Sequence, residues 1–242
     1  MTGAVLLQAE GLAVGWAGQP PLLEGVSLSL AAGERVGLVG PNGAGKSSLF
    51  LTLAGVLPPL EGQLRVNGVD LRPGRFNRDL SLVFQSAEDQ LFCPTLAEDV
   101  AFGPRNLGLR GPALEERVAC ALAVCGLSGL GDRPVHRLSG GEKRRACIAG
   151  ALAMRPRLML LDEPSAALDL RSRRAVIGLL AGLQAALLIA SHDLEMVLEL
   201  CPRVVLIDRG RVRADGPARA ILGDAGLMEA HGQEVPAALR PR

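Results

Sequence analysis

A glycine-rich stretch in the first quarter of the chain has the composition of a phosphate-binding loop. Residues 40–48 read GPNGAGKSS; they follow the apolar run Val36–Val39 and precede the helix-like run Leu49–Ala54. Glycines here let the backbone turn with its N–H groups facing inward, where a polyphosphate can accept from them at the positive end of the next helix. Lys46 would reach the β- and γ-phosphates, and Ser47 would place a hydroxyl on Mg²⁺. A glycine turn between any strand and helix can resemble this pattern by chance, so the loop needs partners elsewhere in the chain.

Two carboxylates follow another apolar run. Asp162 and Glu163 come directly after Leu158–Leu161. In open α/β sheets, ligands bind at the carboxyl ends of the strands, which is where this pair is expected to lie. Asp162 could hold Mg²⁺ through water, and Glu163 could orient or deprotonate the water that attacks the γ-phosphate. A solvated pair at a strand end is the alternative, but it is a poor explanation when a phosphate loop lies upstream.

A second candidate phosphate site precedes the helical run Lys143–Met154. Ser139 and Glu142 fit the S-x-x-E pattern of a simple helix cap. Between them, Gly140 and Gly141 leave backbone donors uncovered at the helix N-terminus, as a phosphate-binding end requires. Two phosphate sites in one chain would compete for the same role. We therefore infer that a bound polyphosphate contacts the glycine loop of one subunit and the Ser139–Glu142 segment of another.

Length and composition are those of one large α/β domain or of a core with small subdomains. The chain has 242 residues, of which 48% are hydrophobic and 2% aromatic, so Leu, Val, Ile and Ala must build the core. The formal net charge of +1 argues against a nucleic-acid binder with a broad basic surface. The cysteines form no C-x-x-C pair, and we expect small buried side chains in a reducing cytoplasm. They are Cys93, Cys120, Cys125, Cys147 and Cys201.

No signal peptide or membrane span is expected. The N-terminus has no basic segment, and Glu10 interrupts its apolar residues. Ala175–Ala190 is apolar apart from Gln184, but its roughly 16 residues fall short of the ~20 that a spanning helix needs. We interpret it as the end of a buried helix followed by a buried strand, so any membrane role must come through a partner.

Strand patterns of two kinds enclose a helical region. Short strand-like runs predict an antiparallel layer within Val5–Leu30, resuming as a hairpin around Asn67-Gly68. Breaks in the first part are expected at Gly11, Gly15 and residues 19–21. A helix should run from the glycine loop to about Gly55. Continuously apolar strands predict a central parallel sheet covered on both faces. They are Leu158–Leu161, Ala186–Ala190 and Val204–Ile207, with a short strand at Leu80–Phe84 and a final hairpin at Arg209-Gly210.

The region between these strands, Ser86–Arg155, has helical patterns such as Ala113–Cys125. A capping box formed by Thr95 and Glu98 predicts a helix that begins near Leu96. The expected fold class is therefore α/β. A nucleotide-binding core with its antiparallel β layer covers about 1–85 and 156–216, a helical subdomain about 86–155, and C-terminal helices and a tail about 217–242.

These motifs occur in the order and spacing of the ATPase domain of ABC transporters, which the chain resembles over about Val5–Gly216. The shared motifs are the glycine loop, Gln85, LSGGE at 138–142, LLDEP at 160–164, Ser165–Asp169 and His192 after a strand. The resemblance implies a single domain with a P-loop NTPase core, a mainly parallel sheet, an antiparallel β subdomain and an inserted α-helical subdomain. It also implies that two such domains dimerise head to tail around two ATP molecules.

Residue roles carry over from this resemblance. The implied nucleotide-binding residues are Trp16, Gly40, Pro41, Asn42, Gly43, Ala44, Gly45, Lys46, Ser47, Ser48, Ser139, Gly140, Gly141, Glu142 and Asp169. Ser47, Gln85 and Asp162 resemble the Mg²⁺ contacts. Glu163 looks like the catalytic carboxylate, assisted by His192, Gln85 and Lys46. Trp16 stands where the family often stacks Tyr on adenine, and an indole can also stack, although a lone Trp beside an edge strand can simply pack.

A narrower resemblance covers Phe84–Phe92, Thr95–Pro104, Asn106–Leu109 and Glu142–Arg145. These segments are similar to the ATPase subunits of energy-coupling-factor importers, most of all those that carry cobalt or nickel. In ABC proteins this region forms the groove that receives a coupling helix from the membrane subunit. The alternative is that several of these residues only pack the helical subdomain. The tail after Gly216 is short for this subgroup.

We therefore expect a peripheral ATPase at the cytoplasmic face of the cell membrane, using ATP and Mg²⁺. Its partners would be membrane permease subunits that import a transition-metal ion or a vitamin, and a second ATPase subunit. A second copy suffices for that subunit, because both halves of the site are intact here. No nucleic-acid partner is expected. The alternatives are an ATPase of another ABC subgroup, importer or exporter, a soluble ABC ATPase acting in cluster assembly or on nucleic acid, and a module that holds ATP without hydrolysing it.

Overall fold

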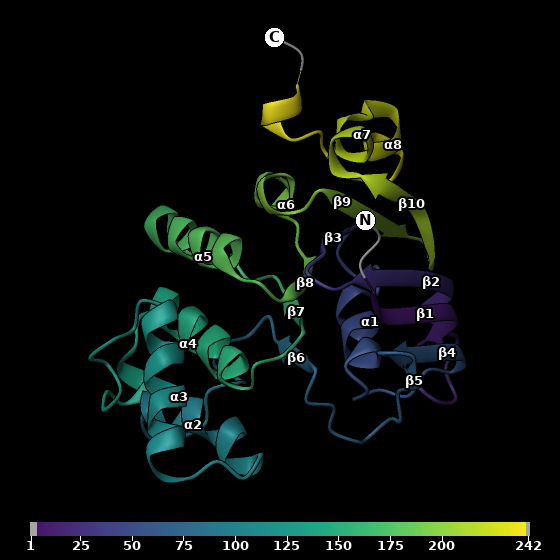
Figure 1. Cartoon of the computed structure of the whole chain (residues 1–242). Coiled ribbons are helices and arrows are strands. Elements are labelled where there is room, and N and C mark those ends of the chain that lie inside the picture. Colours follow the sequence, from purple (N-terminus) through teal and green to yellow (C-terminus); the bar gives the residue numbers. More distant parts are fainter. Residues whose placement is uncertain (1–3, 241–242) are drawn as a thin grey trace. The chain divides into compact units, whose positions relative to one another are not determined.

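The computed structural model describes residues 4–240, which form two compact units (Figure 1). The first unit contains a six-stranded sheet. Its strand order is β10-β9-β3-β8-β7-β6. The strands are β3 (Arg35–Val39), β6 (Leu80–Val83), β7 (Leu158–Asp162), β8 (Ala186–Ala190), β9 (Arg203–Asp208) and β10 (Arg211–Pro217). The strands β9, β3, β8 and β7 pair in parallel, and every residue of β7 and β8 is buried. The predicted parallel sheet is therefore confirmed.

The second sheet of this unit is antiparallel, in the order β2-β1-β4-β5. Its strands are β1 (Val5–Val14), β2 (Leu23–Ala31), β4 (Glu61–Val66) and β5 (Val69–Asp70). Asn67 and Gly68 have φ of 52° and 76°, as the predicted tight hairpin turn requires. The predicted break at Gly11 is wrong: β1 continues through this residue, whose φ is 58°, with a shift of register between Ala9 and Leu12. Gly11 thus forms a bulge inside a strand.

Helix α1 (Lys46–Leu53) joins the two sheets of the first unit. It contacts β1 of the antiparallel sheet and β7 of the six-stranded sheet. Leu49, Phe50 and Leu53 are almost completely buried and belong to one apolar core with residues of both sheets. The helix ends just before Gly55, at φ 75°, close to the predicted end. Burying these side chains anchors the helix that directly follows the glycine loop, so the loop is attached firmly at its C-terminal end.

Short helices complete the first unit after β8. They are α6 (Leu194–Leu200), α7 (Ala218–Gly223) and α8 (Ala225–Ala230), followed by a 3₁₀ turn at Ala237–Leu239. His231, the residue directly after α8, lies with Nδ1 2.8 Å from Oδ2 of Asp208 at the end of β9. Both side chains are largely buried. This contact ties the C-terminal segment to the central sheet.

The contact predicts a pH-dependent contribution to stability. The hydrogen bond with His231 lowers the pKa of Asp208, so its contribution is present above the ordinary Asp pKa and is lost as pH falls through the folded-state value. We expect Asp208→Asn to lower the free energy of unfolding by about 1 kcal/mol at pH 7, with the difference shrinking as pH falls through the lowered folded-state pKa of Asp208. Urea denaturation at pH 7, 4 and 2 measures it. Glu234→Gln, which removes an exposed pair with Arg240, is the control and should change little. An equal loss at all three pH values would contradict the assignment.

The second unit is helical and contains Val83–Pro156 and Pro164–Leu183. Its helices are α2 (Leu96–Asn106), α3 (Gly111–Val124), α4 (Gly140–Ala153) and α5 (Leu170–Gly182), with a 3₁₀ turn at Val135–Arg137. Figure 1 draws them in teal and green. Helices α2, α3 and α4 contact one another, and α5 contacts α4. The predicted capping box of Thr95 and Glu98 is present at the start of α2.

The division of the chain differs from the expected one at residues 164–183. The sequence pattern assigns this segment to the nucleotide-binding core, but the structure groups it with the helical unit. The physical reason is the contact of α5 with α4 of that unit. As predicted, Ala175–Ala190 comprises the end of a helix and a buried strand. Within residues 4–240, no helix combines the length and the apolar character needed to cross a membrane.

Candidate functional site

Three adjacent strands of the six-stranded sheet, β3, β8 and β7, bring three of the four predicted catalytic residues, Lys46, Glu163 and His192, to one edge; the fourth, Gln85, belongs to the second unit. The glycine loop follows β3, Glu163 follows β7, and Ser191 and His192 follow β8. The backbones continue to pair beyond the strands: Glu163 N–H donates to the carbonyl of Ala190 at 2.8 Å, and Ser191 N–H to that of Leu38 at 3.3 Å. The parallel direction of these strands is what brings the segments together.

The glycine loop presents an open cradle of backbone donors. Gly40, Gly43 and Gly45 have φ of 152°, 79° and 93°, a region that side-chain-bearing residues rarely adopt. Gly45 caps α1 without a side-chain hydrogen bond, and the first turn of α1 has no acidic residue. The N–H groups at this helix end are therefore not neutralised by a carboxylate of that turn. A Cβ at Gly43 would meet nothing within 4 Å, so the loop is open there. These features fit a polyphosphate.

Lys46 is a buried cation held over this loop. Its exposed fraction is 8%, and Nζ donates to the carbonyl oxygens of Gly40 at 2.7 Å and Pro41 at 3.0 Å. Burial lowers the pKa of Lys46, while the charges of Glu163 and Asp162 act in the opposite direction. A cation whose hydrogen bonds go to neutral carbonyls keeps its charge available for an anionic ligand, as a β- or γ-phosphate is.

Glu163 is fixed by the residues that follow β8. Only 5% of it is exposed, and its φ of 48° lies in the left-handed region. Oε1 accepts from His192 N–H at 3.0 Å, and Oε2 accepts from Ser191 Oγ at 3.1 Å. Oε2 also lies 2.8 Å from Nδ1 of His192. The strained backbone and these donors hold the carboxylate in one orientation at the sheet edge.

The predicted Mg²⁺ contacts of this unit supply hard oxygen atoms. Asp162 is 6% exposed at the end of β7, and Ser47 lies exposed on the first turn of α1. Carboxylate and hydroxyl oxygens are ligands that Mg²⁺ accepts. Trp16 lies in the turn between β1 and β2 with 50% of its surface exposed. Its indole is thus accessible and is not part of the buried core.

In the second unit, Ser139 and Glu142 form a reciprocal cap at the start of α4. Oε2 of Glu142 accepts from the backbone N–H of Ser139 at 2.7 Å and from its hydroxyl at 2.8 Å. Glu142 N–H donates to Ser139 Oγ at 3.3 Å. The backbone hydrogen bond from Ser139 is the main cause that lowers the pKa of Glu142. The predicted helix cap is thus present, and the phosphate-binding role of the two glycines stays a prediction.

The two glycines of this cap have different surroundings. A Cβ at Gly141 would lie 2.3 Å from Oγ of Ser172 on α5, so only glycine lets the two helices approach this closely. A Cβ at Gly140 would meet nothing within 4 Å. Ser172 is in turn bonded to Asp169, which accepts from its N–H at 2.8 Å and its hydroxyl at 3.0 Å. These bonds lower the pKa of Asp169.

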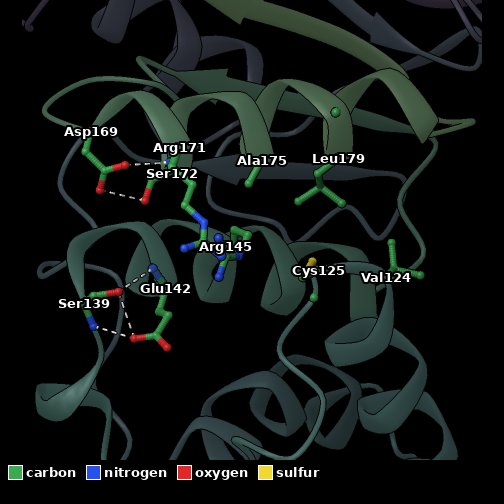
Figure 2. Close-up of a pocket in the computed structure, with 12 residues that line it drawn as sticks. Val124, Cys125, Ser139, Glu142, Arg145, Asp169, Arg171, Ser172, Ala175 and Leu179 are labelled. Carbon is green, nitrogen blue, oxygen red and sulfur yellow. Dashed lines mark hydrogen bonds between the residues drawn. The ribbon is translucent and has the colours of Figure 1, made fainter.

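A cavity of about 750 Å³ brings Ser139, Glu142 and Asp169 together (Figure 2). Figure 2 shows the side chain of Arg145 between its own helix, α4, which begins after Ser139, and α5, which carries Ser172. The structure thus gathers the predicted contacts of the second phosphate site within one unit. Gln85 also belongs to this unit; its side chain is exposed, and its carbonyl accepts from Arg144.

Sequence reasoning missed Ser191. It is completely buried, yet its hydroxyl contacts Glu163. The available signal was a hydroxyl residue directly after the apolar run Ala186–Ala190 and directly before His192. That signal does not identify the acceptor, because Glu163 lies 28 residues earlier in the chain.

Comparison with known proteins gives consistent matches. Residues 23–166 match the family model described as ABC transporter. A cobalt import ATP-binding protein of Rhodobacter capsulatus is 45% identical, over 96% of this chain and 85% of its own length. An energy-coupling factor transporter ATP-binding protein of Methanothermobacter thermautotrophicus is 41% identical, over 96% and 77%. The structure of cbiO1 from Clostridium perfringens, part of the ABC transporter complex cbiONQ, has a TM-score of 0.81 at 30% identity, covering 94% of each chain.

Proposed function

This chain belongs to the ABC transporter family as an ATP-binding and ATP-hydrolysing subunit, and we propose that it powers an energy-coupling-factor importer of cobalt or nickel ion. The observation that carries its catalytic part is the meeting of Lys46, Glu163 and His192 at one edge of the sheet. Cobalt as the cargo is supported by the similarity to the Rhodobacter cobalt import protein, and nickel by the sequence resemblance alone. The membrane subunits, and not this chain, would bind the cargo.

The glycine loop would hold the phosphates. Backbone N–H groups between Gly40 and Ser48, except at Pro41, which has none, and the ammonium of Lys46 would donate to them, and Lys46 would exchange its carbonyl acceptors for phosphate oxygens. The exposed indole of Trp16 offers a stacking face for adenine. Ser47 and Asp162 of the first unit would hold Mg²⁺, which would supply positive charge to the phosphate oxygens.

Glu163 would orient the attacking water and accept its proton. A carboxylate has about four lone-pair sites. Oε2 faces Ser191 and His192, while Oε1 receives the His192 N–H, so Oε1 retains capacity for a water molecule. The side chain of His192 is 64% exposed, so its ring can leave Glu163 and contact the γ-phosphate. Withdrawal of the ring would leave the carboxylate a further acceptor site for the water.

The second half of each ATP site would come from another subunit. Ser139, Gly140, Gly141, Glu142 and Asp169 lie together around the cavity of the second unit or directly beside it. Gly140 has open space at its Cα, so the start of α4 can approach a phosphate. We infer a homodimer closed by ATP, because one chain carries both sets of residues. It would sit peripherally at the cytoplasmic face of the membrane.

An exposed aromatic surface in the second unit supports a membrane partner. Phe92 and Phe102 are 64% and 45% exposed, and their rings form an edge-to-face pair with centroids 4.8 Å apart. Asp99 holds the segment by accepting from the N–H groups of Phe92 and Cys93. A rigid apolar surface of this kind suits an apolar helix from another protein, here the coupling helix of the permease.

The test is recovery of the tagged protein from detergent-solubilised membranes, with partners identified by mass spectrometry and ATPase activity measured on the eluate. We expect a multi-helix membrane subunit and a substrate-binding membrane subunit. Phe92→Ser combined with Phe102→Ser should lose both partners but keep ATP binding. Phe76→Ser, which removes an exposed phenyl ring of the first unit, is the matched control and should keep them. Cellular uptake of radioactive cobalt or nickel then tests the cargo. Recovery of soluble partners alone would refute the transport function.

A further inference from the structure

We infer that Ser191 is a positioning residue for ATP hydrolysis, acting through Glu163. This inference rests on the proposed role of Glu163 as the group that takes a proton from water. The hydroxyl of Ser191 lies 3.1 Å from Oε2 of Glu163, and the residue is completely buried. Its single hydroxyl proton therefore has a carboxylate as its acceptor, and no bulk water contacts Ser191 itself.

The chemistry of the acceptor sets the direction of this hydrogen bond. A carboxylate only accepts, so the Ser191 hydroxyl donates to Glu163. Asp193 N–H donates to the same Ser191 oxygen at 3.1 Å, which uses one of the two lone pairs of that oxygen. The two contacts are therefore compatible, and together they engage the hydroxyl as both donor and acceptor.

Ser191 also differs from the other side chain that holds this carboxylate. The His192 ring is 64% exposed and can move away, whereas Ser191 has no exposed surface and immediately follows a buried strand. When His192 leaves, the Ser191 hydroxyl and the His192 backbone N–H remain on Glu163. Ser191 is thus the side chain that keeps the carboxylate aligned during the chemical step, when its orientation matters most.

A purely structural role is the competing explanation. By accepting from Asp193 N–H, the hydroxyl also stabilises the turn before α6. Loss of that bond alone would lower stability and disturb the turn, but it would do so whether or not residue 163 has a carboxylate. The two explanations can therefore be distinguished by changing Ser191 both in the parent protein and in a variant that lacks the Glu163 carboxylate.

The experiment is a double-mutant cycle with Ser191→Ala and Glu163→Ala, measured by steady-state and single-turnover hydrolysis of radiolabelled ATP in the full-length protein. Alone, Ser191→Ala should lower kcat about tenfold, the usual effect of losing a hydrogen bond to a charged group, with an unchanged KM for ATP. In the Glu163→Ala background it should change the residual rate less than about twofold. Ser27→Ala, which also removes a hydroxyl that accepts a backbone N–H, should leave kcat at the parental value.

The outcomes separate the two levels of the proposal. An equal drop in both backgrounds, or no drop in the parent, would overturn the role of Ser191. A parental rate in Glu163→Ala would instead overturn the catalytic assignment of Glu163. If Ser191→Ala does not fold, Ser191→Cys nearly keeps the volume but donates weakly, and its kcat should fall several-fold. A parental kcat in that variant would refute the inference.

Discussion

Glu163→Gln should bind ATP like the parent protein but hydrolyse it at least about 100-fold more slowly, and it should accumulate as an ATP-bound dimer. The amide keeps the shape of the carboxylate but cannot accept a proton from water, and general-base catalysis is typically worth 10²- to 10⁴-fold. Its NH₂ group would also face the donors of Ser191 or His192. Phosphate release gives the rate, and sedimentation velocity with and without ATP gives the dimer.

The matched control for this variant is Glu34→Gln. Glu34 is a half-buried carboxylate that accepts from Arg203 at 3.0 Å and from Ala31 N–H at 2.7 Å, just before β3 and thus at the opposite end of that strand from the glycine loop. It should retain parental hydrolysis and remain monomeric in ATP under conditions that trap the Glu163 variant. Parental turnover by Glu163→Gln would refute the catalytic assignment. Slow turnover without a dimer would refute the proposed closure.

Gly40→Ala should prevent the glycine loop from forming. A Cβ at this position would lie 2.1 Å from the backbone oxygen of Ile207 on β9, and the φ of 152° is itself unfavourable for alanine. The clash is with backbone of a central strand, which cannot rotate away as a side chain can. We expect a loss of about 3 kcal/mol or more in the free energy of unfolding, with loss of ATP binding. Urea denaturation and nucleotide titration measure both effects.

Gly18→Ala separates the clash from the cost of a positive φ. Gly18 has φ 79° in the turn between β1 and β2, and a Cβ there would meet nothing within 4 Å. This variant should lose only about 1 kcal/mol and keep ATP binding. Similar losses in the two variants would show that φ alone matters and would contradict the role given to Ile207.

The parts of the fold that depend on local chemistry could be predicted. The fold class, the ABC resemblance and the ATPase activity are confirmed by the family match and by the similarity to the Clostridium structure. The hairpin at Asn67-Gly68 and the helix after the glycine loop follow from turn residues and an apolar run. The bulge at Gly11 could not be predicted, because it depends on how β1 pairs with β2 and β4.

The site was only partly accessible to sequence reasoning. Lys46, Asp162, Glu163 and His192 could be identified from their motifs, and the structure places them at one sheet edge; their roles stay predictions. The contact between Ser191 and Glu163 is set by the pairing of β7 with β8, which the chain does not encode locally. The sequence also did not indicate that residues 164–183 belong to the helical unit, because apolar residues continue from α5 into β8 without a change of pattern.

The close approach of Gly141 to Ser172 constrains how this protein can diversify. With a Cβ at residue 141 only 2.3 Å from Oγ of residue 172, a larger residue at either position requires a smaller one at the other. Asp169, which caps α5, accepts from the backbone N–H and from the hydroxyl of Ser172, so a smaller residue at 172 loses the hydroxyl bond. Descendant sequences should therefore inherit residues 141, 169 and 172 as one unit, whereas residue 140 meets no such steric barrier.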